Sequence, residues 1–261
     1  MRRLIFLIFT LSAFLSISIP LDAASIKTAD EIVAASDAVR NPDKPFSLKT
    51  LLIEYRDGRE QEKMALTVYS KERKQGGEYR SLIRFVEPGR DKDKLMLKNG
   101  NILWFYDPSS KASVRISPQQ RLMGQASNGD VVTVNFHNDY ASKLEGEETI
   151  IDAEKKNRAC YRLSLRAANA SVTYHRIEYW VDKENYHPVK GKFYSESDRL
   201  LKITYYRNYR EQLGRQRPGE VVIIDGVDRK LVTKMIFSDY AYRVIPEEWF
   251  QKEYLPHFKG E

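Results

Sequence analysis

The chain has 261 residues, of which 42% are hydrophobic and 30% charged, and its formal net charge is +7. This length fits one large domain or two small ones with a sizeable core. The single cysteine excludes an intramolecular disulfide. We do not expect nucleic-acid binding, because basic and acidic residues are interspersed and do not form a stripe of one sign.

The N-terminal segment has the pattern of a secretory signal. Two arginines precede an uncharged apolar run from Leu4 to Pro20, and small residues follow. We expect a signal peptide over residues 1–23, with cleavage after Ala23 or Ala24, and a single domain over residues 24–261 that works in the periplasm. The alternative is an uncleaved anchor, although the run is at the short limit for a spanning helix.

A short helix is predicted next. Thr28 and Glu31 have the spacing of a capping box, and Asn41-Pro42 ends the helical pattern after about Arg40. The apolar stripe of this segment is thin, with Ile32 and Val33 as its main members. We therefore expect a helix that lies against a sheet.

From Phe46 onward, apolar residues alternate with polar ones, and turn residues recur every eight to twelve positions. This pattern predicts a mainly β fold of roughly ten to twelve meandering strands with a few helices. Asn99-Gly100 between two apolar runs is the strongest hairpin signal in the chain. Cys160 lies within an apolar strand, so a buried hydrophobic role is favoured over a reactive thiol.

The alternation breaks between Pro118 and Asn138, where we predict a short helical insertion. Leu122 and Met123 lie between glutamines and a glycine, and they are the candidate lid of a cavity; a plain surface loop is the alternative. After the last predicted strand, Pro246 to Phe250 has the proline and acidic residues of a helix start.

One face of the predicted sheet is apolar, as Met64, Leu66 and Val68 illustrate. A sheet of this many strands curls, so its concave face must be filled by helices, by another layer or by a ligand. The face is therefore either a ligand cavity or an ordinary core. A charged residue at Leu66 or Ile177 would abolish binding by a folded protein in the first case and unfold it in the second.

Catalytic and metal-binding signals are weak. His137, His175, His187 and His257 lack ligand spacing, and no serine lies in a nucleophile elbow. Two pairs of carboxylates lie in turn-like segments, Glu147 with Glu148 and Asp225 with Asp228. We interpret them as solvent-exposed charges and not as catalytic pairs. We expect no enzyme activity, no metal and no cofactor.

Several short motifs resemble the outer membrane lipoprotein-sorting protein family, the LolA-like class. These motifs are Leu82 to Pro88, Asp93 to Leu97, Leu103 to Pro108, Arg121 to Gln125, Asp139-Tyr140, Cys160 to Leu163, and Tyr179 to Asp182 followed by Pro188. The resemblance implies a single large antiparallel sheet curled into an open (half) β-barrel, with helices covering its concave apolar face. It also implies that acyl chains of lipoproteins or lipids are held in the concavity.

Together, the alternation and the resemblance give a set of residues expected to line the cavity: Met64, Leu66, Val68, Ile83, Phe85, Trp104, Tyr106, Leu163, Leu165, Ile177, Tyr179, Val181, Leu201 and Ile203.

The expected function is a monomeric carrier of acyl chains that contacts membrane surfaces transiently and works between an inner-membrane transporter and an outer-membrane acceptor. A periplasmic sensor of the RseB type and an accessory protein of an inner-membrane exporter of hydrophobic compounds are the alternatives.

Overall fold

One open antiparallel sheet dominates the computed structural model, which describes residues 27–74 and 77–260. The expected signal peptide lies outside these residues. In the described part of the chain, no helix is long and apolar enough to span a bilayer. The strands of the sheet are β1 (Phe46–Arg56), β2 (Arg59–Glu72), β3 (Tyr79–Glu87), β4 (Leu95–Asn99), β5 (Ile102–Asp107), β6 (Ala112–Ile116), β9 (Tyr140–Ile151), β10 (Asn157–Ala167), β11 (Arg176–Asp182), β12 (Pro188–Tyr194), β13 (Leu200–Arg207), β16 (Glu220–Asp225) and β17 (Leu231–Tyr242).

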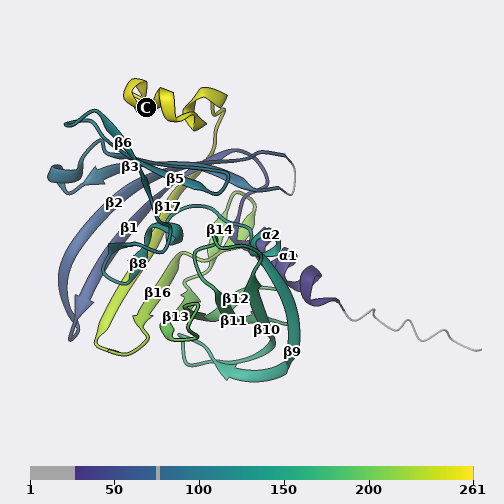
Figure 1. Ribbon diagram of the computed structural model, residues 1–261. Coiled ribbons are helices and arrows are strands. Elements are labelled where there is room, and N and C mark those ends of the chain that lie inside the picture. The colour runs from purple at the N-terminus through teal and green to yellow at the C-terminus, as the bar shows by residue number, and fades with distance from the viewer. Residues whose placement is uncertain (1–26, 75–76, 261) are drawn as a thin grey trace, which may run out of the picture.

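The 13 strands follow the order β6-β5-β4-β3-β2-β1-β17-β16-β13-β12-β11-β10-β9, so β6 and β9 are the two edges. The sheet is strongly curved and does not close (Figure 1). This architecture confirms the predicted half-barrel. The predicted hairpin at Asn99-Gly100 is also confirmed, because Asn99 pairs with Ile102 and Gly100 adopts a φ of +60°.

The two faces of the sheet carry separate apolar clusters, as the alternation requires. On β2, Leu66 and Val68 belong to a large core on the concave side, whereas Tyr69 belongs to a smaller cluster on the convex side. Cys160 is fully buried in a third cluster with Trp180 on the convex side, which confirms its predicted structural role. The concave core is the larger of these clusters.

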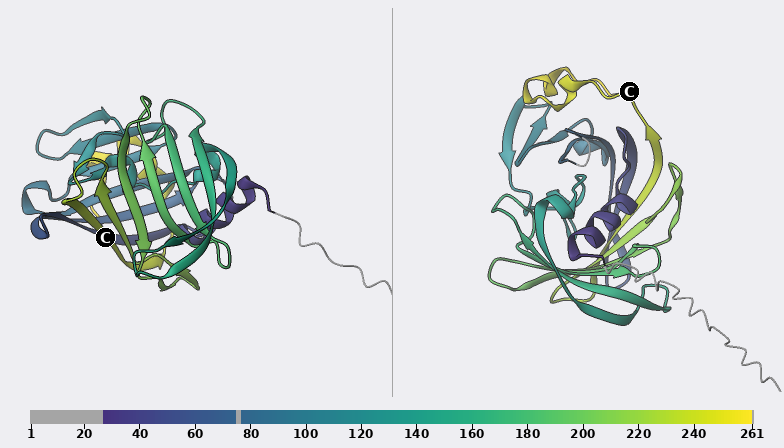
Figure 2. Two further views of the ribbon diagram at one scale, coloured as in Figure 1. Left: turned by 90° about the horizontal axis from the view of Figure 1, so that it is seen from below. Right: turned by 90° about the vertical axis from the view of Figure 1, so that its right-hand side faces the viewer.

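Helix α1 (Ala29–Arg40) lies within the curve of the sheet (Figure 2). Its capping box forms as predicted: Glu31 N donates to the Thr28 hydroxyl at 3.2 Å, and Thr28 N donates to the Glu31 carboxylate at 2.8 Å. Ile32 and Val33 are fully buried in the concave core. Ser36 adds a hydrogen bond of 2.9 Å to the hydroxyl of Tyr179 on β11.

The C-terminal helices η3 (Glu247–Phe250) and η4 (Lys252–His257) cover the convex side of the strands near β6 (Figure 1). Phe250 and Leu255 are buried against Leu82 and Leu97. The predicted C-terminal helical turn is therefore present, and it packs on the convex face of the sheet.

The Glu247 carboxylate fixes this C-terminal segment electrostatically. It forms ion pairs with Arg80 and Lys71, which lower its pKa from 4.5 to about 2. A depressed folded-state pKa contributes stability above pH 4.5 that is lost as the pH falls toward 2.

We expect this pH dependence to weaken in a Glu247→Gln variant, because the amide does not titrate. Urea unfolding of the variant and of the wild-type protein between pH 2 and pH 5 measures the difference, which should be small because the carboxylate is more than half exposed. Glu253→Gln, at an exposed position of η4, is the matched control. An equal pH slope in Glu247→Gln and wild type would contradict the assignment.

Residues 118–139, here called the insert, do not form the predicted helix. They contain a small hairpin of β7 (Arg121–Met123) and β8 (Ala126–Ser127), then η2 (Asn128–Asp130) and the one-turn α2 (Phe136–Asp139). The helix prediction was wrong because Gly124 adopts a φ of +53°, which turns the chain so that Met123 pairs with Ala126 in a hairpin.

Two strand features also differ from the prediction. Strand β9 begins at Tyr140, directly after the insert, and is longer than the alternation indicates, because the first half of this edge strand is mostly polar. A further hairpin, β14 (Arg210–Gln212) and β15 (Arg215–Arg217), was not predicted. Its Arg217 is buried and donates at 2.8 Å to the Val39 carbonyl of α1.

Candidate functional site

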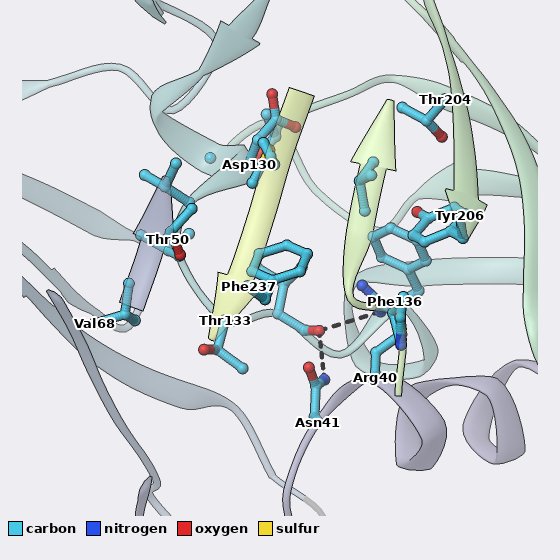
Figure 3. Close-up of a pocket in the computed structure, with 18 of the residues that line it drawn as sticks. Arg40, Asn41, Thr50, Val68, Asp130, Thr133, Phe136, Thr204, Tyr206 and Phe237 are labelled. Atoms are coloured by element: carbon cyan, nitrogen blue, oxygen red, sulfur yellow. Dashed lines mark hydrogen bonds between the residues drawn. The ribbon is translucent and has the colours of Figure 1, made fainter. Parts of the chain in front are cut away.

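A cavity of about 140 Å³ lies between the concave face of the sheet and residues 129–139, the second half of the insert (Figure 3). The sheet contributes Phe46, Leu48, Thr50, Val68, Tyr140, Phe193, Thr204, Tyr206, Val221, Ile223, Met235, Phe237 and Tyr240 to its wall. The insert contributes residues 129–134 together with Phe136 and Asp139. The wall is thus mainly apolar, with hydroxyl groups at intervals.

The size of this cavity limits what it can hold in the observed state. A buried apolar cavity of about 150 Å³ accommodates a molecule the size of benzene. A long acyl chain does not fit such a space. The concave face can therefore receive a chain only if residues 129–136, which cover the cavity, move away from the sheet.

The first half of the insert, residues 118–128, is attached to the sheet at Thr233 on β17. Gln125 N donates to the Thr233 hydroxyl at 2.7 Å. A Cβ atom added to Gly124 would lie 2.3 Å from that hydroxyl, so the close approach requires glycine. Met123 is 5% exposed and belongs to the concave core. This half is packed and hydrogen-bonded in place.

Replacing Gly124 with alanine is expected to detach this half of the insert. The added methyl collides with Thr233, and the positive φ adds backbone strain, for a combined loss of about 2–4 kcal/mol in unfolding free energy. Urea unfolding gives the measurement. Gly100→Ala is the matched control, because its φ is +60° but no atom lies within 4 Å of the added Cβ, so only about 1–2 kcal/mol is lost there. Equal losses would contradict the proposed close contact.

The second half is held by a buried ion pair between Asp130 of η2 and Lys202 of β13. The side chains of these residues are 14% and 4% exposed. The Tyr174 hydroxyl donates to Asp130 at 2.8 Å, and Ser127 N donates to the same carboxylate at 2.7 Å. Asp130 is therefore the polar centre of the attachment of η2 to the sheet.

Polar contacts also join the end of the insert to α1. The side-chain amide of Asn41 donates to the Val134 carbonyl at 2.8 Å, and Arg40 donates to the same carbonyl at 3.3 Å (Figure 3). His137 N donates to the Asp37 carboxylate at 2.8 Å. Each such bond contributes only about 1 kcal/mol net, because water can replace the partner. These hydrogen bonds at the end of the insert can thus be exchanged for water at modest cost, unlike the buried ion pair of Asp130 with Lys202.

Burial shifts the titration of three groups at this site. Burial raises the pKa of Asp139, which lines the cavity, to about 6. Burial lowers the pKa of the Lys202 ammonium, while Asp130 opposes that shift. Burial also raises the pKa of Tyr174 well above its usual range. The ion pair is therefore enclosed in a poorly solvated environment.

Most residues expected to line the cavity belong instead to the packed concave core around it. Val68 is the one member of the expected set that borders the cavity. Leu201 is partly buried and packs against the core. The fully packed members are Met64, Leu66, Ile83, Phe85, Leu163, Leu165, Ile177, Tyr179 and Val181.

Three expected residues lie on the convex face and require correction. Tyr106 belongs to the cluster under the C-terminal helices, and Trp104 packs against it. Leu103 and Phe105 are the residues of β5 that face the concave core. Ile203 pairs in register with Lys192, whose ammonium lies over the convex Trp180 ring. From Lys202 to Tyr206, the inward residues of β13 are the even-numbered ones, because Thr204 and Tyr206 line the cavity.

The expected lid residues, Leu122 and Met123, lie in the first half of the insert, where they pack against the concave core. They do not border the cavity. Val131, Val132 and Val134 of the second half cover it instead. The position of the lid along the chain is thus shifted relative to the sequence-based hypothesis.

The polar residues that hold residues 129–136, the cover of the cavity, were not predicted from the sequence. A local signal existed for Asp130, because Ser127 and Asp130 form a capping box at η2. A second signal was Lys202, a charged residue at an inward position of a strand. Within the described ranges, no cluster of three or more His, Cys, Asp or Glu side chains is placed to hold a metal ion.

Comparisons with known proteins bear on this arrangement. A sequence profile for a family described as "Uncharacterized protein" matches residues 77–257. No curated protein matches the chain. Among solved structures, a LolA superfamily protein from Nitrosomonas europaea is 31% identical, with a TM-score of 0.79 over 88% of this chain and 100% of its own.

Two further structures share the fold at lower identity. An outer membrane lipoprotein-sorting protein domain from Vibrio parahaemolyticus is 20% identical, with a TM-score of 0.73 over 87% of this chain and 98% of its own. A DUF1329 family protein from Desulfovibrio piger is 21% identical, with the same TM-score over 87% of this chain and 97% of its own.

Proposed function

The chain belongs to the LolA superfamily, and from this premise we propose that it is a periplasmic carrier that buries acyl chains of lipoproteins or lipids against the concave face of its sheet. Burial is reversible and involves no catalytic turnover. The acyl chain enters where residues 129–136 of the insert now lie. We further propose that cleavage after Ala23 or Ala24 releases a single domain that acts as a monomer between a membrane donor and a membrane acceptor.

The observation that carries this proposal is the difference between the two faces of the sheet. The convex cluster is closed by helices that pack Phe250 and Leu255 with at most 1% exposure. The concave face is closed beside α1 by a short irregular segment that leaves a cavity (Figure 2). Val131, Val132 and Phe136 of this segment are buried in the concave core, and polar contacts add to its attachment. Such a cover can be exchanged for a ligand.

The magnitudes are compatible with reversible exchange. Burying a dozen methylenes contributes roughly 10 kcal/mol at about 0.8 kcal/mol each. Displacing residues 129–136 costs the burial of a few valines and a phenylalanine, at about 1.5–3 kcal/mol each, together with several hydrogen bonds at about 1 kcal/mol each. The buried Asp130–Lys202 ion pair adds to the cost of displacement. The cost of moving the segment therefore offsets the gain from burying the acyl chain, which makes binding reversible.

Native mass spectrometry with lipid extraction tests the proposal on protein purified from a periplasm. We expect a stoichiometric acylated adduct, and the same protein refolded from urea without lipid is the control for nonspecific adducts. A clean apo mass that persists after incubation with lipoproteins and phospholipids would overturn the carrier proposal.

A further inference from the structure

A second hollow, a cleft of about 280 Å³, lies beside the cavity and is lined by the first half of the insert and by the start of β13. Three cationic side chains, Arg121, Arg199 and Lys202, border it, with Asp225 as its one acidic residue. The uncharged polar groups of Gln119, Gln125, Ser127 and Tyr174 and the apolar groups of Leu200, Leu201 and Val227 complete its wall. We call it the cationic cleft.

The charge of the cleft is not balanced by its own acid. The Asp225 carboxylate accepts hydrogen bonds from the backbone amides of Val227 at 2.8 Å and Asp228 at 2.9 Å, so it stabilises the local turn. Among the described residues, neither Arg121 nor Arg199 forms an ion pair. Two guanidinium groups are therefore available to an anion there.

Polar groups lie between the cleft and the cavity. Tyr174 borders both spaces. Asp130 lies on the cavity side, and Lys202, its ion-pair partner, lies on the cleft side. An amphiphile whose chain occupied the cavity region would therefore place its headgroup next to the Lys202 ammonium.

We propose that the cationic cleft binds the phosphate-bearing headgroup of the carried lipid, held by Arg121, Arg199 and Lys202. This inference rests on the carrier function proposed above and assigns its ligand class. A phosphate presents several acceptor oxygens to two arginines, which bind such groups in a bidentate manner. An uncharged headgroup would leave these cations without a counter-charge.

The same site explains how the cover can leave. Asp130 belongs to the half of the insert that must move, whereas Arg121 and Gln125 belong to the half fastened at Thr233. Removing Asp130 alone would leave the Lys202 ammonium buried without a partner, which is strongly unfavourable. A phosphate in the cleft takes the place of the Asp130 carboxylate, so the ammonium stays paired while the chain enters.

Calorimetric titration with two matched amphiphiles tests the inference. Octyl phosphate and octyl glucoside share one chain and differ in the headgroup, and inorganic phosphate supplies the anion without a chain. For the wild-type protein we expect octyl phosphate to bind at least about tenfold more tightly than octyl glucoside and than inorganic phosphate. In an Arg121→Gln/Arg199→Gln variant the preference for octyl phosphate should disappear while octyl glucoside binding is unchanged.

The matched control is Arg115→Gln/Arg166→Gln, which removes the same charge at two exposed positions away from the cleft and should keep the preference. A preference that survives Arg121→Gln/Arg199→Gln overturns the inference. Inorganic phosphate binding as tightly as octyl phosphate also overturns it, because the cleft would then be a free-anion site. Equal binding of both amphiphiles overturns the headgroup site alone, whereas binding of neither overturns the carrier proposal as well.

Discussion

Replacing Asp130 with asparagine is expected to destabilise the protein by about 3–5 kcal/mol, because it leaves a buried ammonium without its counter-charge. The Lys202 side chain is only 4% exposed, so water cannot replace the lost carboxylate without rearrangement. Urea unfolding at neutral pH gives the measurement. The loss should shrink as the pH rises toward the usual lysine pKa of 10.5, because a neutral amine needs no partner.

A double-mutant cycle identifies the ion pair as the cause. Lys202→Met should cost less than Asp130→Asn, because Asp130 keeps the amide of Ser127 and the hydroxyl of Tyr174 as donors. The double variant Asp130→Asn/Lys202→Met should be more stable than Asp130→Asn alone, since no buried charge remains. Additive losses from the two substitutions would contradict the coupling.

The same variant reports on the mobility of the cover. If residues 129–136 are released when Asp130 no longer holds them, limited proteolysis of Asp130→Asn should cut within the insert before the rest of the chain. Wild type under the same conditions is the reference. Cleavage elsewhere first would show that the ion pair stabilises the sheet without controlling the cover.

Replacing Leu66 with aspartate is expected to unfold the protein, at a cost of about 5 kcal/mol or more. Leu66 is 1% exposed and lies within the concave core, away from the cavity wall. The charge would be buried among Phe85 and other apolar side chains without a partner. Circular dichroism and urea unfolding of the variant check this result.

Thr67→Asp is the matched control on the next residue of the same strand. Thr67 is half-buried on the convex face and pairs in register with Lys49 and Arg84, so a carboxylate there meets positive charge and water. We expect a change within about 0.5 kcal/mol. A folded Leu66→Asp protein would show that this part of the concave face is hollow.

These expectations refine the alternatives that the sequence left open for the apolar face. The alternation treats Leu66 and Val68 as equivalent, since both point to the concave side. In the structure, Val68 borders the cavity, whereas Leu66 is packed within the core. The face is core at one end of a strand and cavity wall a few residues further along.

Features that depend on neighbouring residues could be predicted from the sequence alone. The capping box at Thr28, the hairpin turn at Gly100 and the two-residue alternation of the strands are local, so they were predicted correctly. The open sheet was expected from the resemblance to the LolA-like class and is also confirmed. The alternation failed at Trp104 and Ile203 because a strand pattern shows that two faces exist but does not state which face is concave.

The positions of the cavity and the cleft depend on contacts that form when the chain folds. The contacts that position the insert join residues far apart in the chain: Asp130 and Lys202 are separated by 72 positions, and Gln125 and Thr233 by 108. No local periodicity encodes such pairs, because each residue alone is an ordinary polar side chain. These residues act together only after the curved sheet brings each pair into contact.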